Sequence, residues 1–271
     1  MRNSQDSLPF LKWAGGKRWL AKSCPNAFSA SRSLRYVEPF LGSGAIFFSL
    51  GIKMAMLNDV NAELIDTYIA IRDNWSAVDE KLKEHHASHS PEHFYMVRSQ
   101  SPCTQYERAA RFIYLNRTCF NGLYRVNLHG KFNVPIGTKS NVILDTDNFE
   151  NISKILGNVD LRSEDFEVIV DECGEGDFIF ADPPYTVKHN NNGFVKYNEK
   201  LFSWADQERL KKALASAVDR GALVVVSNAD HPSIRELYKG FRIDVLERQS
   251  IMASESAKRK STTEVLISMG K

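Results

Sequence analysis

The sequence predicts an α/β protein whose mostly parallel sheet is interrupted by one long insertion. Apolar stretches with strand character occur at 35–37, 54–57, 177–181 and 222–227. The first two are each followed by helically spaced apolar residues, at 45–50 and 63–72. A segment of different character separates these two strands from the later two. Strands and helices that alternate on both sides of such a segment are typical of a parallel sheet with one excursion.

The C-terminal part carries the signals of a capped helix and of an antiparallel edge. Ser203 and Asp206 have the spacing of a capping box, and Gly221 is placed to end the helix that follows. The stretches 243–246 and 264–268 alternate in polarity, which predicts antiparallel strands at one edge of the sheet.

Composition excludes several classes of protein. The chain has 271 residues, of which 43% are hydrophobic and 25% charged, as in ordinary globular proteins. Its net charge of +2 excludes a uniform polycation. No apolar run approaches the roughly eighteen residues of a membrane helix, and residues 1–7 are polar without a following apolar stretch. We therefore expect no membrane association and a cytoplasmic location, with the four scattered cysteines as free thiols.

The segment from 74 to 158 differs from the rest of the chain. It begins as polar helix and becomes rich in loops. Between 106 and 140 it carries six basic residues against the single acid Glu107. A local basic excess on a nearly neutral chain favours a surface that meets nucleic-acid phosphates.

A glycine turn between the first strand and helix predicts a cofactor site. Phe40 opens this turn, and Gly42 and Gly44 let its backbone approach a ligand closely. Asp59 follows the second strand, where an acid can bind both hydroxyls of a ribose. Dinucleotides and S-adenosylmethionine both satisfy this pattern. The third glycine of the dinucleotide fingerprint is absent, which favours S-adenosylmethionine.

A second glycine turn, Lys12–Lys17, allows two interpretations. It is either a surface turn anchored by Trp13, or a turn that holds an indole and an ammonium group over a ligand. In the second case Lys17 reaches the cofactor carboxylate, and Trp13 packs on the cationic methionine end.

The tetrapeptide Asp182-Pro183-Pro184-Tyr185 follows an apolar strand and predicts the catalytic site. Two prolines stiffen the chain, so that the Asp182 carboxylate and the Pro183 carbonyl form a fixed pair of acceptors. Such a pair suits a planar amino group with two N–H donors, and Tyr185 offers a face for an aromatic ring. Accepting the hydrogens localises charge on the nitrogen and orients it for direct methyl transfer.

Together these motifs resemble the Dam family of DNA adenine N6-methyltransferases over nearly the whole chain. The matching motifs, in the order of the family, are Lys12–Lys17, Phe40–Gly44, Asn58-Asp59, Asn116–Asn127, Phe132–Pro135 and Asp182–Tyr185. The resemblance implies a Rossmann-like methyltransferase sheet formed by 1–73 and 159–271. It also implies an inserted, mainly helical target-recognition domain at 74–158, with a β-hairpin loop near 117–136.

The resemblance also implies roles for individual residues. The residues implied to bind S-adenosylmethionine are Trp13, Lys17, Phe40, Gly42, Gly44, Asp59, Asp165, Phe166 and Asp182. Tyr185 would stack on a flipped adenine, beside the catalytic Asp182 and Pro183. The residues implied to contact DNA are Phe120, Asn121, Leu123, Arg125 and Pro135, and the basic residue Arg117 is a candidate for a phosphate contact. Of these, Phe120 or Leu123 would fill the gap in the duplex, and Arg125 would read a guanine of GATC.

Three functions remain open on the sequence. The first is a site-specific DNA adenine N6-methyltransferase that acts on double-stranded GATC as a monomer, in bacteria or phages, with a restriction endonuclease as a possible functional companion. The second is an amino-methyltransferase that acts on RNA or on a protein amide. The third is a non-catalytic DNA-binding protein on a methyltransferase scaffold. No metal is expected in any of them, because the histidines 85, 89 and 93 are interrupted by Pro91 and lack an acidic or cysteine co-ligand.

Overall fold

The strands form one mixed sheet in the order β3-β2-β1-β4-β5-β7-β6, which confirms the predicted fold class. The computed structural model describes residues 8–13, 15–127, 130–187, 202–249 and 261–270. The chain divides into two compact units. Unit 1 consists of Met1–Pro25 and Leu41–Ser163, and unit 2 of Asn26–Phe40 and Glu164–Lys271.

Unit 1 contains two parallel strands and most of the helices. Strand β2 (Ala55–Asn58) pairs with β3 (Val159–Arg162), with Ala55 opposite Val159. The helices are α1 (Arg18–Ser23), α2 (Ala45–Leu50), α3 (Ala62–Ala87), α4 (Pro91–Ser99), α5 (Gln105–Thr118), the 3-10 turn η2 (Phe120–Gly122) and α6 (Phe149–Leu156). No helix in the described part of the chain combines the length and apolar character that crossing a membrane requires.

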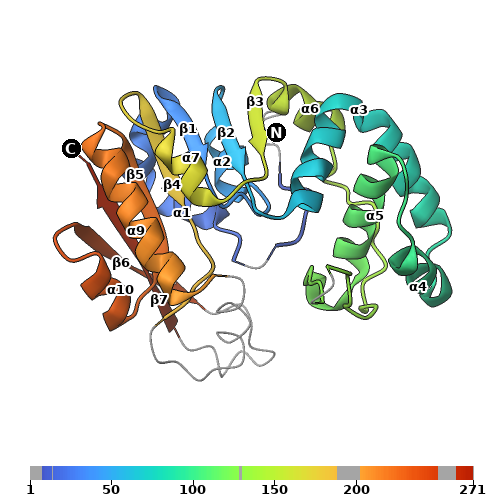
Figure 1. Cartoon of the computed structure of the whole chain (residues 1–271). Helices are drawn as coiled ribbons and strands as arrows, with labels where there is room; N and C mark the ends of the chain where they lie inside the picture. Colours follow the sequence, from blue (N-terminus) through green and yellow to red (C-terminus); the bar gives the residue numbers. More distant parts are fainter. Residues whose placement is uncertain (1–7, 14, 128–129, 188–201, 250–260, 271) are drawn as a thin grey trace. The chain divides into compact units, whose positions relative to one another are not determined.

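Helices α3 and α5 pack along each other (Figure 1). The side chain of Asn61 caps α3 by accepting from Leu64 N, and a capping box of Thr104 and Glu107 starts α5. Helix α3 leaves helical geometry at Asn74 (φ −153°, ψ 59°), the position where the sequence places the start of the inserted domain. From Ala109 onward α5 is buried on nearly every side, so its stability depends on its neighbours.

The loop after α5 is closed by backbone contacts. Antiparallel bridges join Cys119 to Ile136 and Val126 to Phe132, in place of the regular strands of a hairpin. The N–H of Gly137 donates to Thr118 O (2.8 Å). A Cβ at position 137 would lie 2.6 Å from Cys119 O, so only glycine allows the two sides to approach this closely. We call residues 119–137 the recognition loop.

Unit 2 contains the other five strands. Strands β1 (Arg35–Glu38), β4 (Asp177–Ala181) and β5 (Leu223–Ala229) pair in parallel. Strand β7 (Ser261–Met269) pairs antiparallel with β5 and with β6 (Arg242–Gln249), which confirms the predicted antiparallel edge. The helical elements are η1 (Pro25–Arg32), α7 (Phe166–Asp171), α9 (Trp204–Asp219) and α10 (Pro232–Leu237).

The patterns read from the sequence explain these elements. Strand β4 is buried at every position, as a strand covered on both faces must be. Helix α9 begins with the predicted capping box of Ser203 and Asp206, and Gly221 follows its end at φ +100°. Helices α7 and α9 run side by side over the strands of this unit (Figure 1).

Three histidines surround the Tyr114 ring where α3, α4 and α5 meet. His85 stacks on Tyr114 with 4.9 Å between ring centroids, and its Nδ1 lies 3.1 Å from His93 Nε2. His89 Nδ1 lies 2.9 Å from the Tyr114 hydroxyl. Among the residues that the structure describes, no group of three or more His, Cys, Asp or Glu side chains is arranged to hold a metal. The three imidazole rings pack around the Tyr114 ring.

Acid is expected to destabilise this cluster. Burial, and secondarily the neighbouring His93, lowers the pKa of His85 from 6.5 to about 4. The unfolded chain therefore binds a proton at His85 before the folded chain does, and this contribution to stability is lost as the pH falls from 6.5 towards 4. Melting temperatures measured from pH 7.5 to 4.5 should fall more steeply for the wild type than for His85→Gln. Parallel curves would contradict this assignment.

Candidate functional site

The turn that precedes α2 presents backbone groups in left-handed conformations. Gly42 has φ +50° and Gly44 has φ +63°, values that side-chain-bearing residues rarely adopt. A Cβ at position 42 would lie 2.7 Å from Cδ1 of Trp13. The Trp13 indole therefore lies directly against the turn at Gly42 and anchors it. This contact is compatible with both interpretations of the Lys12–Lys17 turn.

Asp59 is fixed to the same turn. Its carboxylate accepts hydrogen bonds from Gly42 N and Asn61 N, both at 3.0 Å. Burial raises the pKa of Asp59, and the two amide donors oppose that effect. The Tyr68 hydroxyl of α3 donates to Gly42 O (3.1 Å) and so also holds the turn. Each carboxylate oxygen can still accept a second hydrogen bond, as binding of a ribose diol requires.

Lys17 stands at the start of α1 and is only 3% exposed. Within the same turn Trp13 also faces Phe112 of α5, with stacked rings 6.5 Å apart. Unit 1 thus brings Trp13, Gly42 and Asp59 into one neighbourhood.

Unit 2 carries the predicted catalytic tetrapeptide immediately after β4. The Tyr185 hydroxyl lies 2.9 Å from Ser227 Oγ and 3.4 Å from a carboxylate oxygen of Glu264. Burial, with the charges of Asp182 and Glu264, raises the pKa of Tyr185 well above 10, so the ring stays neutral. Ser227 and Glu264 have no sequence signal of their own, because the pairing of β4 with β5 brings Ser227 to Tyr185 and the pairing of β5 with β7 brings Glu264.

The segment after the tetrapeptide is tied to the start of α9. Thr186 Oγ1 donates to Phe202 O (2.6 Å), and Gln207 Nε2 lies 3.5 Å from Pro184 O. Both side chains are fully buried. These contacts hold the two prolines from the side of α9, so the stiffness predicted from the sequence has a tertiary support.

An aromatic group in unit 2 contains two of the predicted cofactor residues. Phe40 and Phe166 lie 5.5 Å apart, and Phe202 is within 5.6 Å of both. Asp165 caps α7 by accepting from Glu167 N (2.9 Å). Aromatic faces beside a carboxylate have the chemistry that an adenine ring and its amine require.

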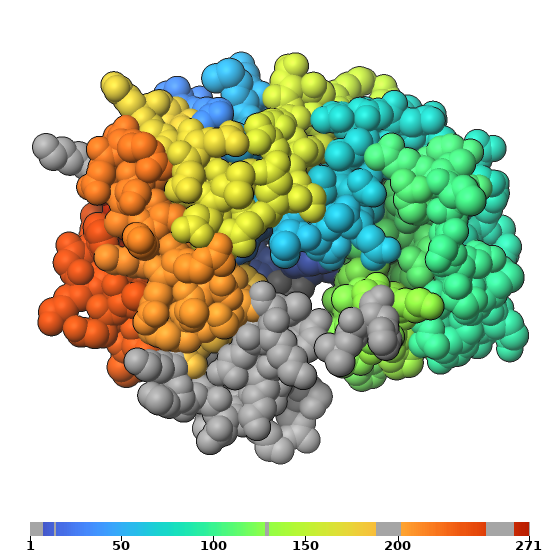
Figure 2. Space-filling view, viewed as in Figure 1, coloured from blue at the N-terminus to red at the C-terminus, as the bar shows by residue number. Residues whose placement is uncertain are grey.

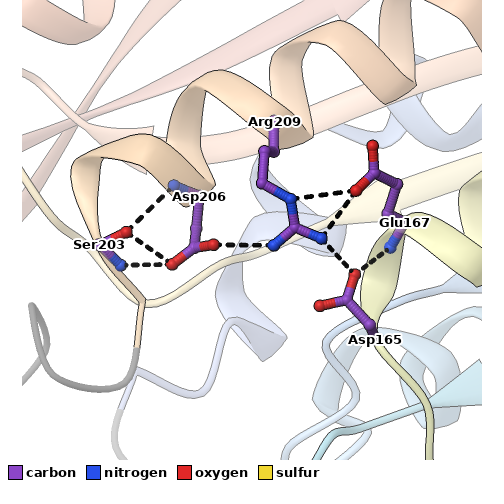
Figure 3. A network of polar contacts seen from close by, with 5 residues as sticks. All are labelled: Asp165, Glu167, Ser203, Asp206 and Arg209. Carbon is purple, nitrogen blue, oxygen red and sulfur yellow. Dashed lines mark hydrogen bonds and ion pairs between the residues drawn. The ribbon is translucent and has the colours of Figure 1, made fainter.

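Arg209 joins the starts of α7 and α9 (Figure 3). Its guanidinium binds Asp165 (2.9 Å), Glu167 (2.7 Å) and Asp206 (2.9 Å). It also lies 4.9 Å from the centre of the Phe166 ring. No motif in the sequence points to Arg209, although its guanidinium contacts both Asp165 and Phe166.

The recognition loop places most of the predicted DNA-contacting residues near the surface of unit 1. Phe120 is 54% exposed, and its N–H donates to Pro135 O (2.9 Å). Asn121 is exposed in a left-handed conformation (φ +55°), and Leu123 is half-buried. Arg125 Nε donates to Asn133 Oδ1 (3.1 Å). Figure 2 shows this segment in light green, reaching the surface of its unit.

Arg117 departs from this group. It is completely buried, and its guanidinium donates to the carbonyls of Phe10 (2.8 Å) and Val142 (2.7 Å). Two further bonds of 2.6 Å join it to both carboxylate oxygens of Asp147. Because these internal acceptors engage the guanidinium, we assign Arg117 a structural role in place of the predicted phosphate contact.

The chain is similar to several known proteins. A family model described as D12 class N6 adenine-specific DNA methyltransferase matches residues 13–252. The chain is 37% identical to the type II methyltransferase M1.LlaDCHI of Lactococcus lactis subsp. cremoris, over 98% of this chain and 96% of the relative. It is 28% identical to a DNA adenine methylase of Escherichia coli strain K12, over 95% and 93%. Among solved structures, the rRNA methyltransferase aviRa from Streptomyces viridochromogenes aligns at a TM-score of 0.44 and 15% identity, over 99% and 93%.

Proposed function

Because the chain belongs to the D12 class of N6 adenine-specific DNA methyltransferases, we propose that its target is the adenine of GATC, flipped out of duplex DNA. The enzyme depends on S-adenosylmethionine and acts on DNA. The observation that carries the proposal is Asp182-Pro183-Pro184-Tyr185, which follows a buried strand and is braced at Tyr185 by Ser227. The family resemblance of the recognition loop supports GATC.

The described residues fit S-adenosylmethionine, which supplies an electrophilic methyl group on sulfur. In unit 1 the glycine turn, Asp59 and the buried Lys17 offer a backbone cradle, a ribose acceptor and a cation for the carboxylate. In unit 2 Phe40, Phe166 and Asp165 offer an adenine site.

The chain's own part in the reaction is to hold and polarise the adenine amine. The Asp182 carboxylate and the Pro183 carbonyl accept its two N–H bonds, which localises electron density on the nitrogen. Bound S-adenosylmethionine would supply the methyl group to the nitrogen lone pair with cleavage of the methyl–sulfur bond, and the surplus proton of the methylated nitrogen would pass to solvent water. Neutral Tyr185 stacks on the ring and fixes the direction of attack.

Base flipping leaves a gap in the duplex that a side chain must fill. The proposal assigns this role to Phe120, because an apolar ring that is 54% exposed is costly unless a partner covers it. Unstacking the adenine costs a few kcal/mol, which the wedge and the contacts of Tyr185 offset.

Transfer of labelled methyl to two duplexes tests the proposal. One duplex contains a single GATC, and the other has 2-aminopurine, which lacks the N6 amine, in place of each target adenine. Label on the first alone supports both the reaction and the site. Label on other adenine-containing duplexes but not on GATC would retain the enzyme class and overturn the assigned sequence.

Replacing Arg125 with alanine is expected to relax recognition of one guanine. An arginine paired with guanine O6 and N7 contributes about 1–3 kcal/mol of discrimination. The ratio of kcat/KM between GATC and a duplex altered at that guanine should therefore fall by about five- to 150-fold. Equal losses on all duplexes would make Arg125 a phosphate contact instead.

We also propose that the protein acts as a monomer in the cytoplasm. A companion restriction endonuclease remains part of the proposal, because one relative is named a type II methyltransferase. The non-catalytic alternative and the RNA or protein alternative have no observation that favours them over the family assignment.

A further inference from the structure

We propose that Asn116 is a positioning residue that links the Lys12–Lys17 turn to the recognition loop, so that cofactor and DNA each tighten binding of the other. The inference rests on the proposed function, because it takes the turn as part of the cofactor site and the loop as the DNA-binding element.

The Asn116 carboxamide pairs with both backbone groups of Lys12. Lys12 N donates to Asn116 Oδ1 (2.8 Å), and Asn116 Nδ2 donates to Lys12 O (2.7 Å). The Asn116 side chain thus satisfies the backbone N–H and C=O of Lys12, as a neighbouring β-strand would do. Asn116 is completely buried, so water cannot replace either bond if the pair separates.

The same carboxamide lies against the start of the recognition loop. Asn116 Nδ2 is 3.5 Å from Gly122 O. A Cβ at Gly122 would lie 2.9 Å from Lys12 Cδ, so the loop backbone packs directly on the Lys12 side chain. Lys12 Nζ completes the contact by donating to Arg117 O (2.6 Å). Movement of the turn therefore requires movement of the loop.

A row of aromatic rings makes a second connection in unit 1. Trp13, which lies on Gly42, faces Phe112 at 6.5 Å. Phe112 contacts Tyr124 at 4.1 Å, and Tyr124 contacts Phe132 at 4.9 Å. Tyr124 also donates to Glu63 at the start of α3. Tyr124 and Phe132 of the recognition loop are thereby connected through Phe112 to Trp13, the residue that anchors the glycine turn.

Two elements joined in this way share their ordering cost. A ligand that fixes the turn also restricts the loop, so the second ligand loses less conformational entropy on binding. Linkage then requires the effect to be equal in both directions.

Asn116→Asp breaks the pairing with a minimal change in shape. It retains an acceptor for Lys12 N but sets an oxygen against Lys12 O. Asn141→Asp is the matched control, since Asn141 is exposed in the same unit and the charge change is identical. The probe is S-adenosylhomocysteine, which binds without reacting, and the readout is the Kd of a fluorescent GATC duplex with and without it.

The wild type and Asn141→Asp should each bind the duplex at least about fivefold more tightly in the presence of S-adenosylhomocysteine. Asn116→Asp should lose most of that gain, and the duplex should lose its effect on S-adenosylhomocysteine affinity to the same degree. Asn116→Leu, which removes both bonds without adding charge, serves if the aspartate variant does not fold.

A lowered melting temperature with an unchanged coupling factor would overturn the inference and leave Asn116 a purely structural residue. Absence of coupling in the wild type would overturn it as well. The methyl-transfer assay on the wild type comes first, because failure to methylate GATC rejects the proposed function before Asn116 is tested.

Discussion

Replacing Asp182 with alanine is expected to lower the rate of methyl transfer by about 10³-fold while duplex binding stays measurable. In the proposed mechanism this carboxylate is one of the two acceptors that localise charge on the amine, and it directly follows β4 and precedes two prolines. Its loss leaves Pro183 as the only acceptor, so the amine is bound but neither polarised nor aimed. The effect should therefore appear in single-turnover rates and far less in the Kd for DNA.

Asp171→Ala provides the control, because Asp171 is an exposed acid at the end of α7 in the same unit. Its transfer rate should match that of the wild type. An Asp182→Ala protein that has lost its fold, or that no longer binds the duplex, would show that the role given to Asp182 is wrong.

Replacing Arg117 with methionine is expected to destabilise the protein by about 3–5 kcal/mol. The substitution leaves the Asp147 carboxylate, with a side chain only 9% exposed, without its bidentate partner. It also removes the donors to the carbonyls of Phe10 and Val142. The free-energy cost of the unpaired, buried Asp147 carboxylate is far larger than the stabilisation from burying the apolar methionine side chain.

Urea denaturation measures this loss, and Arg108→Met is its control. Arg108 lies on the same helix, but it is exposed and donates only to Cys103 O, so its removal should cost less than about 1 kcal/mol. A second change, Asp147→Leu, should restore part of the stability of Arg117→Met, because it removes the orphaned charge. Unchanged stability combined with weaker duplex binding would restore Arg117 as a phosphate contact.

The sequence predicted the elements well because local signals determine them. The capping box at Ser203, the stop at Gly221 and the alternation of β6 and β7 depend on neighbours along the chain. Helix α3 covers both the helix predicted at 63–72 and the polar helical start of the next segment, and it leaves helical geometry at Asn74 between them.

The contacts around the site could not be predicted in the same way. Arg117 and Arg125 lie in one basic segment and look alike in the sequence. Only the fold brings Phe10, Val142 and Asp147 around the first of them. Likewise, Ser227 contacts Tyr185 and Arg209 contacts Asp165, and each pair is more than forty positions apart in the sequence. Contacts at such separations produce no periodic pattern that a sequence could reveal.

The backbone closure of the recognition loop bears on how target preference diverges among descendants of such an enzyme. The bonds from Gly137 to Thr118 and from Phe120 to Pro135 use main-chain atoms only, so they are indifferent to the side chains between them. The exposed side chains among them, such as Asn121 and Asn133, can change without breaking these bonds, whereas Phe132 and Val134 are buried. On the proposed function, single substitutions at the exposed positions would change the target sequence, whereas a side chain at position 137 meets the Cys119 carbonyl and disrupts the closure itself.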